Sequence, residues 1–172
     1  MTQLESIKSQ NEEYAKSFKH GDLSLPPSKK IAVLACMDAR LNVNDLLGLG
    51  IGEAHIIRNA GGIATEDAIR SLIISRELLG TEEFFVINHT DCDMLIFSDQ
   101  DLQKKISEKY SSNASGIVFH SFDDLEENVK KQVAKIRNTP FLLDAASVTG
   151  FVYDVRTGRI KEIKSRIYSL NF

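Results

Sequence analysis

The chain has 172 residues, a length at which one domain buries about 70 % of the surface of its unfolded chain. Its 42% hydrophobic and 26% charged residues, with a net charge of -3, are typical of a globular protein and predict no basic surface for nucleic acid. No apolar run reaches the roughly 20 residues of a membrane span, and the N-terminus lacks the order of a signal peptide. We therefore expect a cytoplasmic protein with one domain, residues 1–172, that binds neither nucleic acid nor membrane.

Residues 1–25 predict an N-terminal helical arm. Between Leu4 and His20, spacings of three, seven and four residues place a narrow apolar stripe on one face of a helix. The stripe consists of Leu4, Ile7, Tyr14 and Phe18. Such a helix either docks loosely on its own domain or lies across a partner subunit. Pro26 and Pro27 then end it, because proline has no backbone amide to donate.

Beyond the arm, apolar runs alternate with segments of helical period. The apolar runs predict strands from about Lys30 to Cys36, at Ala54–Arg58, at Glu83–Asn88 and at Gly116–Phe119. The periodic segments predict helices at Leu41–Leu49, Thr65–Leu79, Asp99–Tyr110 and Asp123–Ile136. Ala146–Ile163 alternates about Thr157-Gly158 as a hairpin does. We expect an α/β fold with a mostly parallel central β-sheet flanked by helices, an N-terminal helical arm and a C-terminal antiparallel edge strand or hairpin.

Candidate metal ligands follow two of the predicted strands. Cys36 ends the first, and His89 and Cys92 follow Glu83–Asn88. Sites in such sheets form at the carboxyl ends of the strands, so these side chains can converge. Two thiolates and one imidazole suit zinc, and three protein ligands leave a fourth position open, as in catalytic zinc sites. The sequence therefore predicts one zinc ion per chain.

Simpler interpretations remain for each of these residues. A single cysteine is often a small buried hydrophobic residue, and a single histidine is often a hydrogen-bonded polar group. A disulfide between Cys36 and Cys92 is a further alternative, which a reducing compartment counts against. Asp38 and Arg40, which follow Cys36, could form an ordinary surface ion pair.

Several motifs together resemble the β-class carbonic anhydrases, most closely the small prokaryotic-type branch. The resemblance covers roughly Lys29 to Met94, and we place a zinc-site core at residues 29–98. The motifs are Cys36-Met-Asp-Ala-Arg40, Gly48-Leu-Gly50, Ala54-His-Ile-Ile-Arg-Asn-Ala-Gly-Gly62 and His89-Thr-Asp-Cys92.

The resemblance implies a zinc lyase that reversibly hydrates carbon dioxide to bicarbonate and a proton. Zinc would be held by Cys36, His89 and Cys92. Asp38 would either pair with Arg40, so that the pair orients a zinc-bound hydroxide, or bind the metal as a fourth ligand that closes the site. The family also implies a homodimer or a tetramer built on dimers, with the N-terminal arm packed on the partner subunit.

Two further positions bear on the substrate. Asn59, Gly61 and Gly62 belong to a tight turn that would shape the substrate pocket. Asp93 departs from the family, which usually has glycine after the second cysteine. Its carboxylate would stabilise the metal, repel bicarbonate, assist proton transfer or point to solvent, and the backbone there must be one that a side chain can adopt.

Two other functions stay open from the sequence. One is a catalytically weak zinc-binding or bicarbonate-sensing protein, in which Asp38 permanently occupies the fourth position. The other is a carbon disulfide or carbonyl sulfide hydrolase on the same fold.

Overall fold

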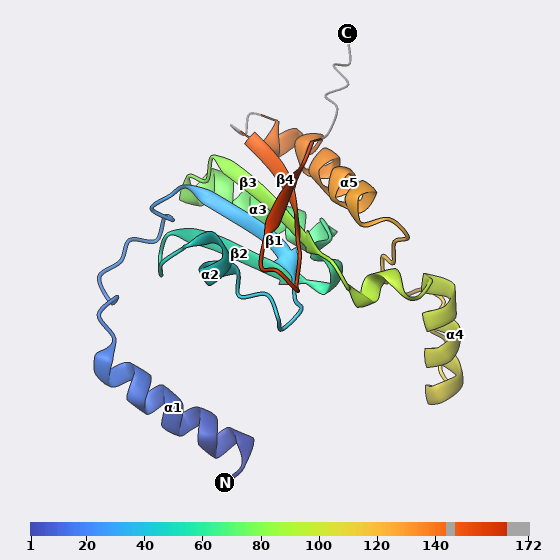
Figure 1. Cartoon of the computed structure of the whole chain (residues 1–172), viewed down its shortest axis with the longest axis horizontal. Coiled ribbons are helices and arrows are strands. Elements are labelled where there is room, and N and C mark those ends of the chain that lie inside the picture. Colours follow the sequence, from blue (N-terminus) through green and yellow to red (C-terminus); the bar gives the residue numbers. More distant parts are fainter. Residues whose placement is uncertain (144–146, 165–172) are drawn as a thin grey trace.

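A five-stranded sheet forms the centre of the molecule, with strand order β2-β1-β3-β4-β5 (Figure 1). The computed structural model describes residues 1–143 and 147–164. The strands are β1 (Ile31–Cys36), β2 (Ala54–Asn59), β3 (Glu83–His89), β4 (Ser147–Tyr153) and β5 (Ile160–Ile163). The first four are parallel, and β5 runs antiparallel to β4. The expected α/β fold is therefore confirmed, including its C-terminal hairpin, although Ala146 lies outside the described residues.

Helices connect the strands and cover both faces of the sheet. They are α1 (Gln3–Ser17), α2 (Val43–Leu47), α3 (Glu66–Leu79), α4 (Asp99–Tyr110) and α5 (Leu125–Arg137), with single 3-10 turns η1 (Ala60–Gly62), η2 (Asp93–Leu95) and η3 (Pro140–Leu142). The predicted ends of α3 are confirmed, because they depend on interactions between residues close in sequence. Thr65 caps α3 by accepting a hydrogen bond from Ala68 N, and Gly80 ends that helix in the left-handed conformation.

β1 lies between two apolar layers, so all six of its residues are buried. Ala32 and Leu34 belong to the cluster under α3 and α5, and Val33 and Ala35 belong to the cluster with α2 on the other face. A strand buried on both faces reads as a continuous apolar run. This burial fixes the position of Cys36, the last residue of β1, along the strand direction.

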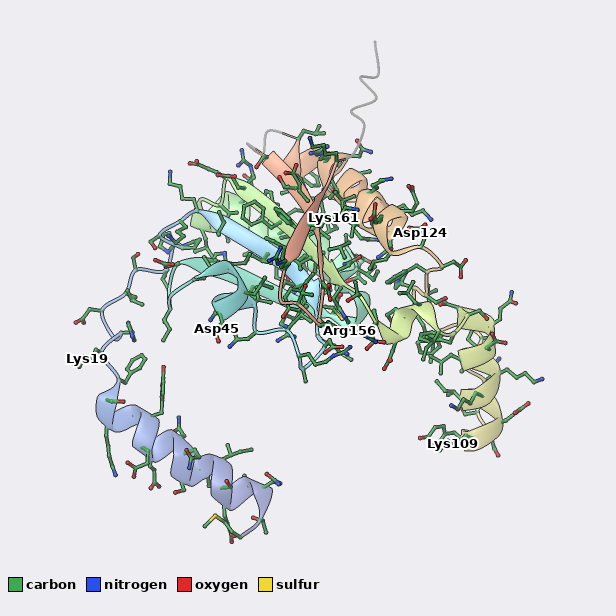
Figure 2. All side chains as sticks on the ribbon, in the orientation of Figure 1. Lys19, Asp45, Lys109, Asp124, Arg156 and Lys161 are labelled. Atoms are coloured by element: carbon green, nitrogen blue, oxygen red, sulfur yellow. The ribbon has the colours of Figure 1, made fainter. Side chains whose placement is uncertain are left out.

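Two helices project from this body, α1 at one side and α4 at another (Figure 1). Neither contains a buried residue. Lys109 lies at the far end of α4 (Figure 2). α1 confirms the predicted helix but ends at Ser17, three residues before His20. Among the described residues, no helix is long and apolar enough to cross a membrane.

The strand predicted at Gly116–Phe119 is wrong, because no strand forms there. The backbone bonds instead to α4. The Asp99 carboxylate accepts hydrogen bonds from the amides of Phe119, His120 and Ser121 at 2.8, 3.1 and 2.8 Å. His120 has a φ of 61°, which an extended strand does not allow. One carboxylate therefore replaces a neighbouring strand as the partner of this segment.

Candidate metal centre

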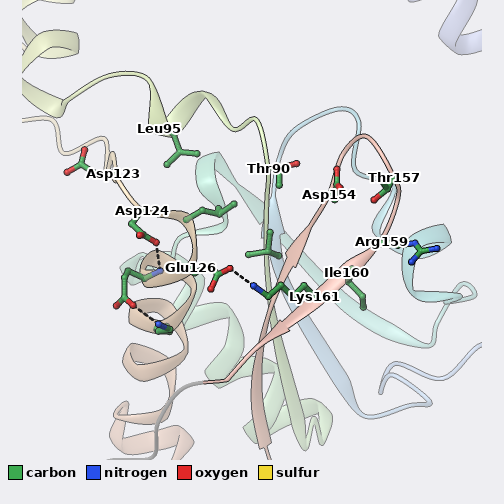
Figure 3. Close-up of a pocket in the computed structure, with 14 residues that line it drawn as sticks. Thr90, Leu95, Asp123, Asp124, Glu126, Asp154, Thr157, Arg159, Ile160 and Lys161 are labelled. Carbon is green, nitrogen blue, oxygen red and sulfur yellow. Dashed lines mark hydrogen bonds and ion pairs between the residues drawn. The ribbon is translucent and has the colours of Figure 1, made fainter.

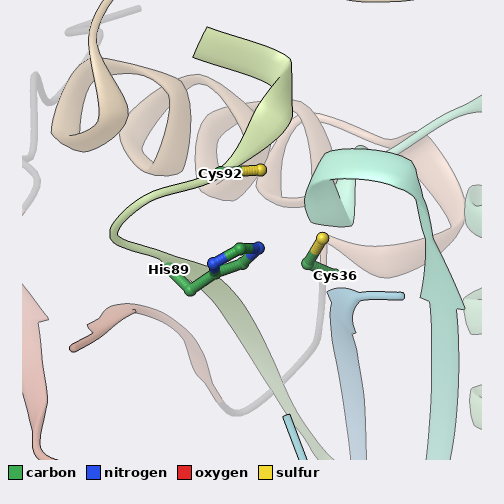
Figure 4. A group of neighbouring side chains, drawn as sticks. All are labelled: Cys36, His89 and Cys92. Carbon is green, nitrogen blue, oxygen red and sulfur yellow. The ribbon is translucent and has the colours of Figure 1, made fainter. Parts of the chain in front are cut away.

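Cys36, His89 and Cys92 come together at the carboxyl end of the sheet (Figure 4). β1 and β3 are parallel neighbours, paired from Ile31 with Glu83 to Ala35 with Ile87, so their last residues reach the same edge. The two Sγ atoms and a ring nitrogen of His89 all lie within 4.8 Å of one another. The three side chains are buried. The convergence predicted from the strand ends is present in the structure.

His89 provides the observation that tests this group against a metal. Its Nδ1 donates a hydrogen bond to the carbonyl of Thr90 at 2.8 Å, which leaves the lone pair on Nε2. Among the described residues, Nε2 is the one buried side-chain nitrogen or oxygen without a hydrogen-bond partner. Such an atom costs about 1–3 kcal/mol if it stays unpaired. A zinc ion would satisfy it, and the donor set of two sulfurs and one nitrogen fits zinc.

Cys36 and Cys92 lie close together, and each thiol affects the acidity of the other. The contact with Cys92 lowers the pKa of Cys36 against the effect of burial, which raises it. The same contact, together with burial, raises the pKa of Cys92. One thiol therefore ionises more readily, and the other holds its proton more tightly. Metal binding requires both thiolates, so a cation would replace the remaining proton.

Asp38 and Arg40 form a close ion pair at the rim of this group. Asp38 Oδ1 accepts from Arg40 N at 2.8 Å and from Nε at 3.0 Å, and Oδ2 accepts from Nη2 at 2.7 Å. These bonds hold the pKa of Asp38 well below its usual range, so the carboxyl is ionised. Asp38 Oδ2 lies 3.7 Å from His89 Nε2. The carboxylate thus stands next to the open lone pair.

Two residues of this centre were missed by sequence reasoning. Arg58 donates to the carbonyl of Cys36 from Nε at 2.9 Å and to that of Asp38 from Nη2 at 2.6 Å. Asp91 accepts from Arg40 Nη1 at 2.8 Å. Asp91 stood inside the His-Thr-Asp-Cys motif, and Arg58 at the end of the neighbouring strand. Their positions in the sequence, next to the candidate ligands, indicated that they could belong to the site. Their partners lie on other elements, so the contacts cannot be predicted from residue spacing.

The Asn59–Gly62 turn lies directly behind Cys36. Asn59 closes the turn by accepting from Ile63 N at 2.8 Å and donating to Ile63 O at 2.7 Å. Gly62 has a φ of 61°, and a Cβ there would lie 3.0 Å from the amide nitrogen of Cys36. Glycine is required for this close approach. Gly61 has a φ of 78°. The role of Asn59, Gly61 and Gly62 in a substrate pocket stays a prediction.

A chain of buried amides supports this turn from the core. Asn88 Nδ2 donates to Gly61 O at 2.9 Å, and Asn88 Oδ1 accepts from Asn128 Nδ2 at 2.7 Å. Asn128 Oδ1 accepts from Gln132 Nε2 at 2.8 Å, and Gln132 Oε1 accepts from Ala64 N at 2.9 Å. The chain joins α5 to β3 and to the segment behind Cys36. Because every amide has a partner, each is fixed in one orientation.

Asp93 begins η2 with an ordinary backbone, since its φ is not positive. A side chain is therefore accepted where the family usually has glycine. The side chain is exposed, and the described residues give its carboxylate no hydrogen bond or ion pair. It borders a pocket of about 370 Å³ that is mainly apolar, together with Ile96, Phe97, Asp101, Leu102 and Lys105. Its effect on the metal or substrate stays a prediction.

A pocket of about 1250 Å³ lies between α5 and the β4–β5 hairpin (Figure 3). Thr90 is part of its wall, but Cys36, Asp38, Arg40, His89 and Cys92 are not. Lys161 crosses it to pair with Glu126 at 2.6 Å. This pocket is separate from the metal group.

Known proteins resemble the chain over most of its length. The family model described as carbonic anhydrase matches residues 31–160. Beta-carbonic anhydrase 1 of Mycobacterium tuberculosis is 45% identical over 95% of this chain and 99% of its own. A carbonic anhydrase structure from Streptococcus mutans has a TM-score of 0.88 at 38% identity, covering 95% of this chain and 99% of that one. A carbon disulfide hydrolase of Acidithiobacillus thiooxidans is 32% identical over 84% of this chain and 82% of its own.

Proposed function

The chain belongs to the β-class carbonic anhydrases, and we propose from this that it reversibly hydrates carbon dioxide to bicarbonate and a proton, with one zinc ion held by Cys36, His89 and Cys92. The observation that carries the proposal is the buried, unpaired Nε2 of His89, which lies 3.7 Å from the Asp38 carboxylate, on a ring with a nitrogen within 4.8 Å of both thiol sulfurs. The matched residues 31–160 include all of these groups.

A zinc ion in this group would supply Lewis acidity, which makes water a stronger acid near neutral pH. The chain's own residues determine how that acidity is used. The hydrogen bond from His89 Nδ1 to Thr90 O fixes the ring and directs Nε2 into the group. Cys36 and Cys92 pack in an apolar cluster with Leu41, Ile63, Met94 and Phe122. Such surroundings lower the local dielectric constant and strengthen the electrostatic interactions of the site.

Asp38 is the residue that we propose to orient the attacking water. Since Arg40 keeps the carboxyl ionised, Asp38 can accept a hydrogen bond but cannot donate one. An acceptor of fixed position would hold the water so that its lone pair faces carbon dioxide. Both carboxylate oxygens bond to Arg40, which corresponds to the paired arrangement. A protein in which Asp38 permanently blocks the metal would have to break this pairing.

The decisive experiment is stopped-flow hydration of carbon dioxide from about pH 6.5 to about pH 9, on either side of the pKa of about 7 that catalytic zinc gives to water. Zinc content is measured on the same sample. We expect a rate well above buffer that rises with pH. No rate anywhere in this range, at one zinc per chain, would instead support the weak or sensing alternative.

Carbon disulfide hydrolysis is a second candidate, because relatives bearing that name match at 31–34% identity. The comparison is made by following release of hydrogen sulfide from carbon disulfide with the same zinc-loaded protein. We expect carbon dioxide to be the better substrate, in line with the higher identity to a carbonic anhydrase.

We further propose a homodimer, or a tetramer of two dimers, in which α1 packs on the partner subunit. On α1 and just after it, Leu4, Ile7, Tyr14 and Phe18 are 62%, 65%, 52% and 46% exposed, a stripe that the described residues of the chain leave largely uncovered. Light scattering of the whole chain and of one lacking residues 1–25 tests this, and an equal number of subunits in both would refute it. We also expect the protein in the cytoplasm, where reducing conditions keep Cys36 and Cys92 as thiols.

A further inference from the structure

The guanidinium of Arg40 lies between the two loops that carry the metal group. One loop follows β1 and contains Cys36 and Asp38. The other follows β3 and runs from His89 to Cys92. Towards the first loop, Arg40 uses Nε and Nη2 to bind the Asp38 carboxylate. Towards the second loop, Nη1 donates to Asp91 Oδ2 at 2.8 Å and Nη2 donates to Asp91 O at 2.9 Å.

The backbone of Asp91 makes this double contact possible. Its φ of 57° is left-handed, a conformation that aspartate, asparagine and glycine adopt more readily than other residues. Asp91 presents both its carbonyl oxygen and its carboxylate to one guanidinium. Arg40 therefore binds two carboxylates at once. Its guanidinium, which comes from the loop after β1, contacts both the side chain and the backbone of Asp91 in the loop after β3.

We propose that Asp91 is a positioning residue which, through Arg40, clasps the Cys36–Arg40 loop to the His89–Cys92 loop and keeps the guanidinium in place whichever partner Asp38 takes. The inference rests on the proposed function and on the two positions that the family resemblance allows for Asp38, paired with Arg40 or bound to the metal. Without the Asp91 carboxylate, Arg40 would keep only its hydrogen bond to the backbone carbonyl of residue 91 when Asp38 leaves it. With Asp91, the guanidinium stays at the rim and Asp38 can return to the same geometry.

The test measures zinc release from the loaded protein to a chromophoric chelator, a reading that does not depend on activity. Asp91→Asn removes the charge and keeps a residue that tolerates the left-handed backbone. Asp91→Gly removes the whole side chain and also tolerates that backbone. Asp67→Asn is the matched control, because Asp67 pairs with Arg70 at 2.8 Å on the surface of α3, away from both loops.

We expect zinc release to be about threefold to fivefold faster in both Asp91 variants, the range of an exposed ion pair, and unchanged in the control. Because Asp91 acts through Arg40, Asp91→Asn should add nothing in an Arg40→Ala background. A purely structural role of Asp91 would accelerate release in that background as well.

Unchanged zinc release in Asp91→Gly would overturn the inference. An equal acceleration with and without Arg40 would overturn it too. If the wild type holds zinc but hydrates no carbon dioxide while the coupling to Arg40 is present, the clasp stands and the proposed function fails. If the wild type is active and the coupling is absent, the reverse holds.

Discussion

The metal centre and the α4 region, residues 99–121, show two ways in which this chain places a polar group. In the centre, Cys36 and His89 are the last residues of β1 and β3, Cys92 follows in the loop after β3, and all three are buried. Beside α4, the Asp99 carboxylate holds residues 119–121 by three hydrogen bonds, and α4 itself has no buried residue. Burial gives the centre a geometry that few changes can relax. The amides of residues 119–121 share one carboxylate as their acceptor, so the order of this short segment can be lost separately.

The largest effect is expected from removing a ligand. Cys92→Ser replaces a buried sulfur by a hydroxyl that binds zinc poorly, so zinc and activity should both be lost. The loss of zinc affinity should exceed the roughly 100-fold typical of changes to residues that only support a ligand. Metal analysis after dialysis and stopped-flow assays measure it, with circular dichroism to confirm the fold. A fully loaded, active variant would remove Cys92 from the ligand set.

Asp38→Ala separates the metal from the reaction. We expect zinc to be retained, because three ligands remain, and activity to fall by about 100-fold or more, the usual size of a proton-handling contact. Zinc analysis and carbon dioxide hydration on one sample test this. Full activity in this variant would refute the role given to Asp38.

Glycine substitutions compare the two regions directly. Gly62→Ala forces a Cβ against Cys36 N and Asn88 Nδ2 with a φ of 61°, so we expect it to lower the free energy of unfolding by roughly 2 to 4 kcal/mol. Gly116→Ala, in the segment beside α4, meets no atom within 4 Å and should change it by less than about 0.5 kcal/mol. Urea unfolding of both proteins measures the difference. Equal effects would show that the turn behind Cys36 is less constrained than its geometry indicates.

The smallest effect is expected for the pH dependence of the contact between Asp99 and residues 119–121. Hydrogen bonds from Ser121, and from the amides of Phe119 and His120, lower the pKa of Asp99 from 3.8 to about 2. A lowered pKa in the folded state means that this contribution is full above about pH 4 and is lost as the pH falls through about 2. Amide exchange of residues 119–121 should show the local opening. Asp99→Asn should open this segment already at neutral pH, and the difference from wild type should shrink in acid. An equal difference at both pH values would contradict the assignment.

The same contrast explains what the sequence could predict. Ile31–Cys36 and the strand before His89 were readable because burial on both faces leaves a continuous apolar run, and the ligands follow directly. Gly116–Phe119 has a similar composition, but its backbone bonds to Asp99, which lies on a different element. Arg58 and Asp91 were missed for the same reason. Local patterns give elements and their ends, whereas contacts between elements require the fold.

The buried amides of Asn88, Asn128 and Gln132 have a consequence for the proton that hydration releases. An amide neither gains nor loses a proton near neutral pH, so a chain of amides cannot relay one by changing its charge. The wall behind Cys36 therefore insulates the reaction from the interior of the protein. We expect the proton to leave instead where the site meets water, near Arg40 and Asp91, whose side chains are 46% and 66% exposed. The site is thus open to water at Arg40 and Asp91 and is bounded behind Cys36 by amides that do not titrate.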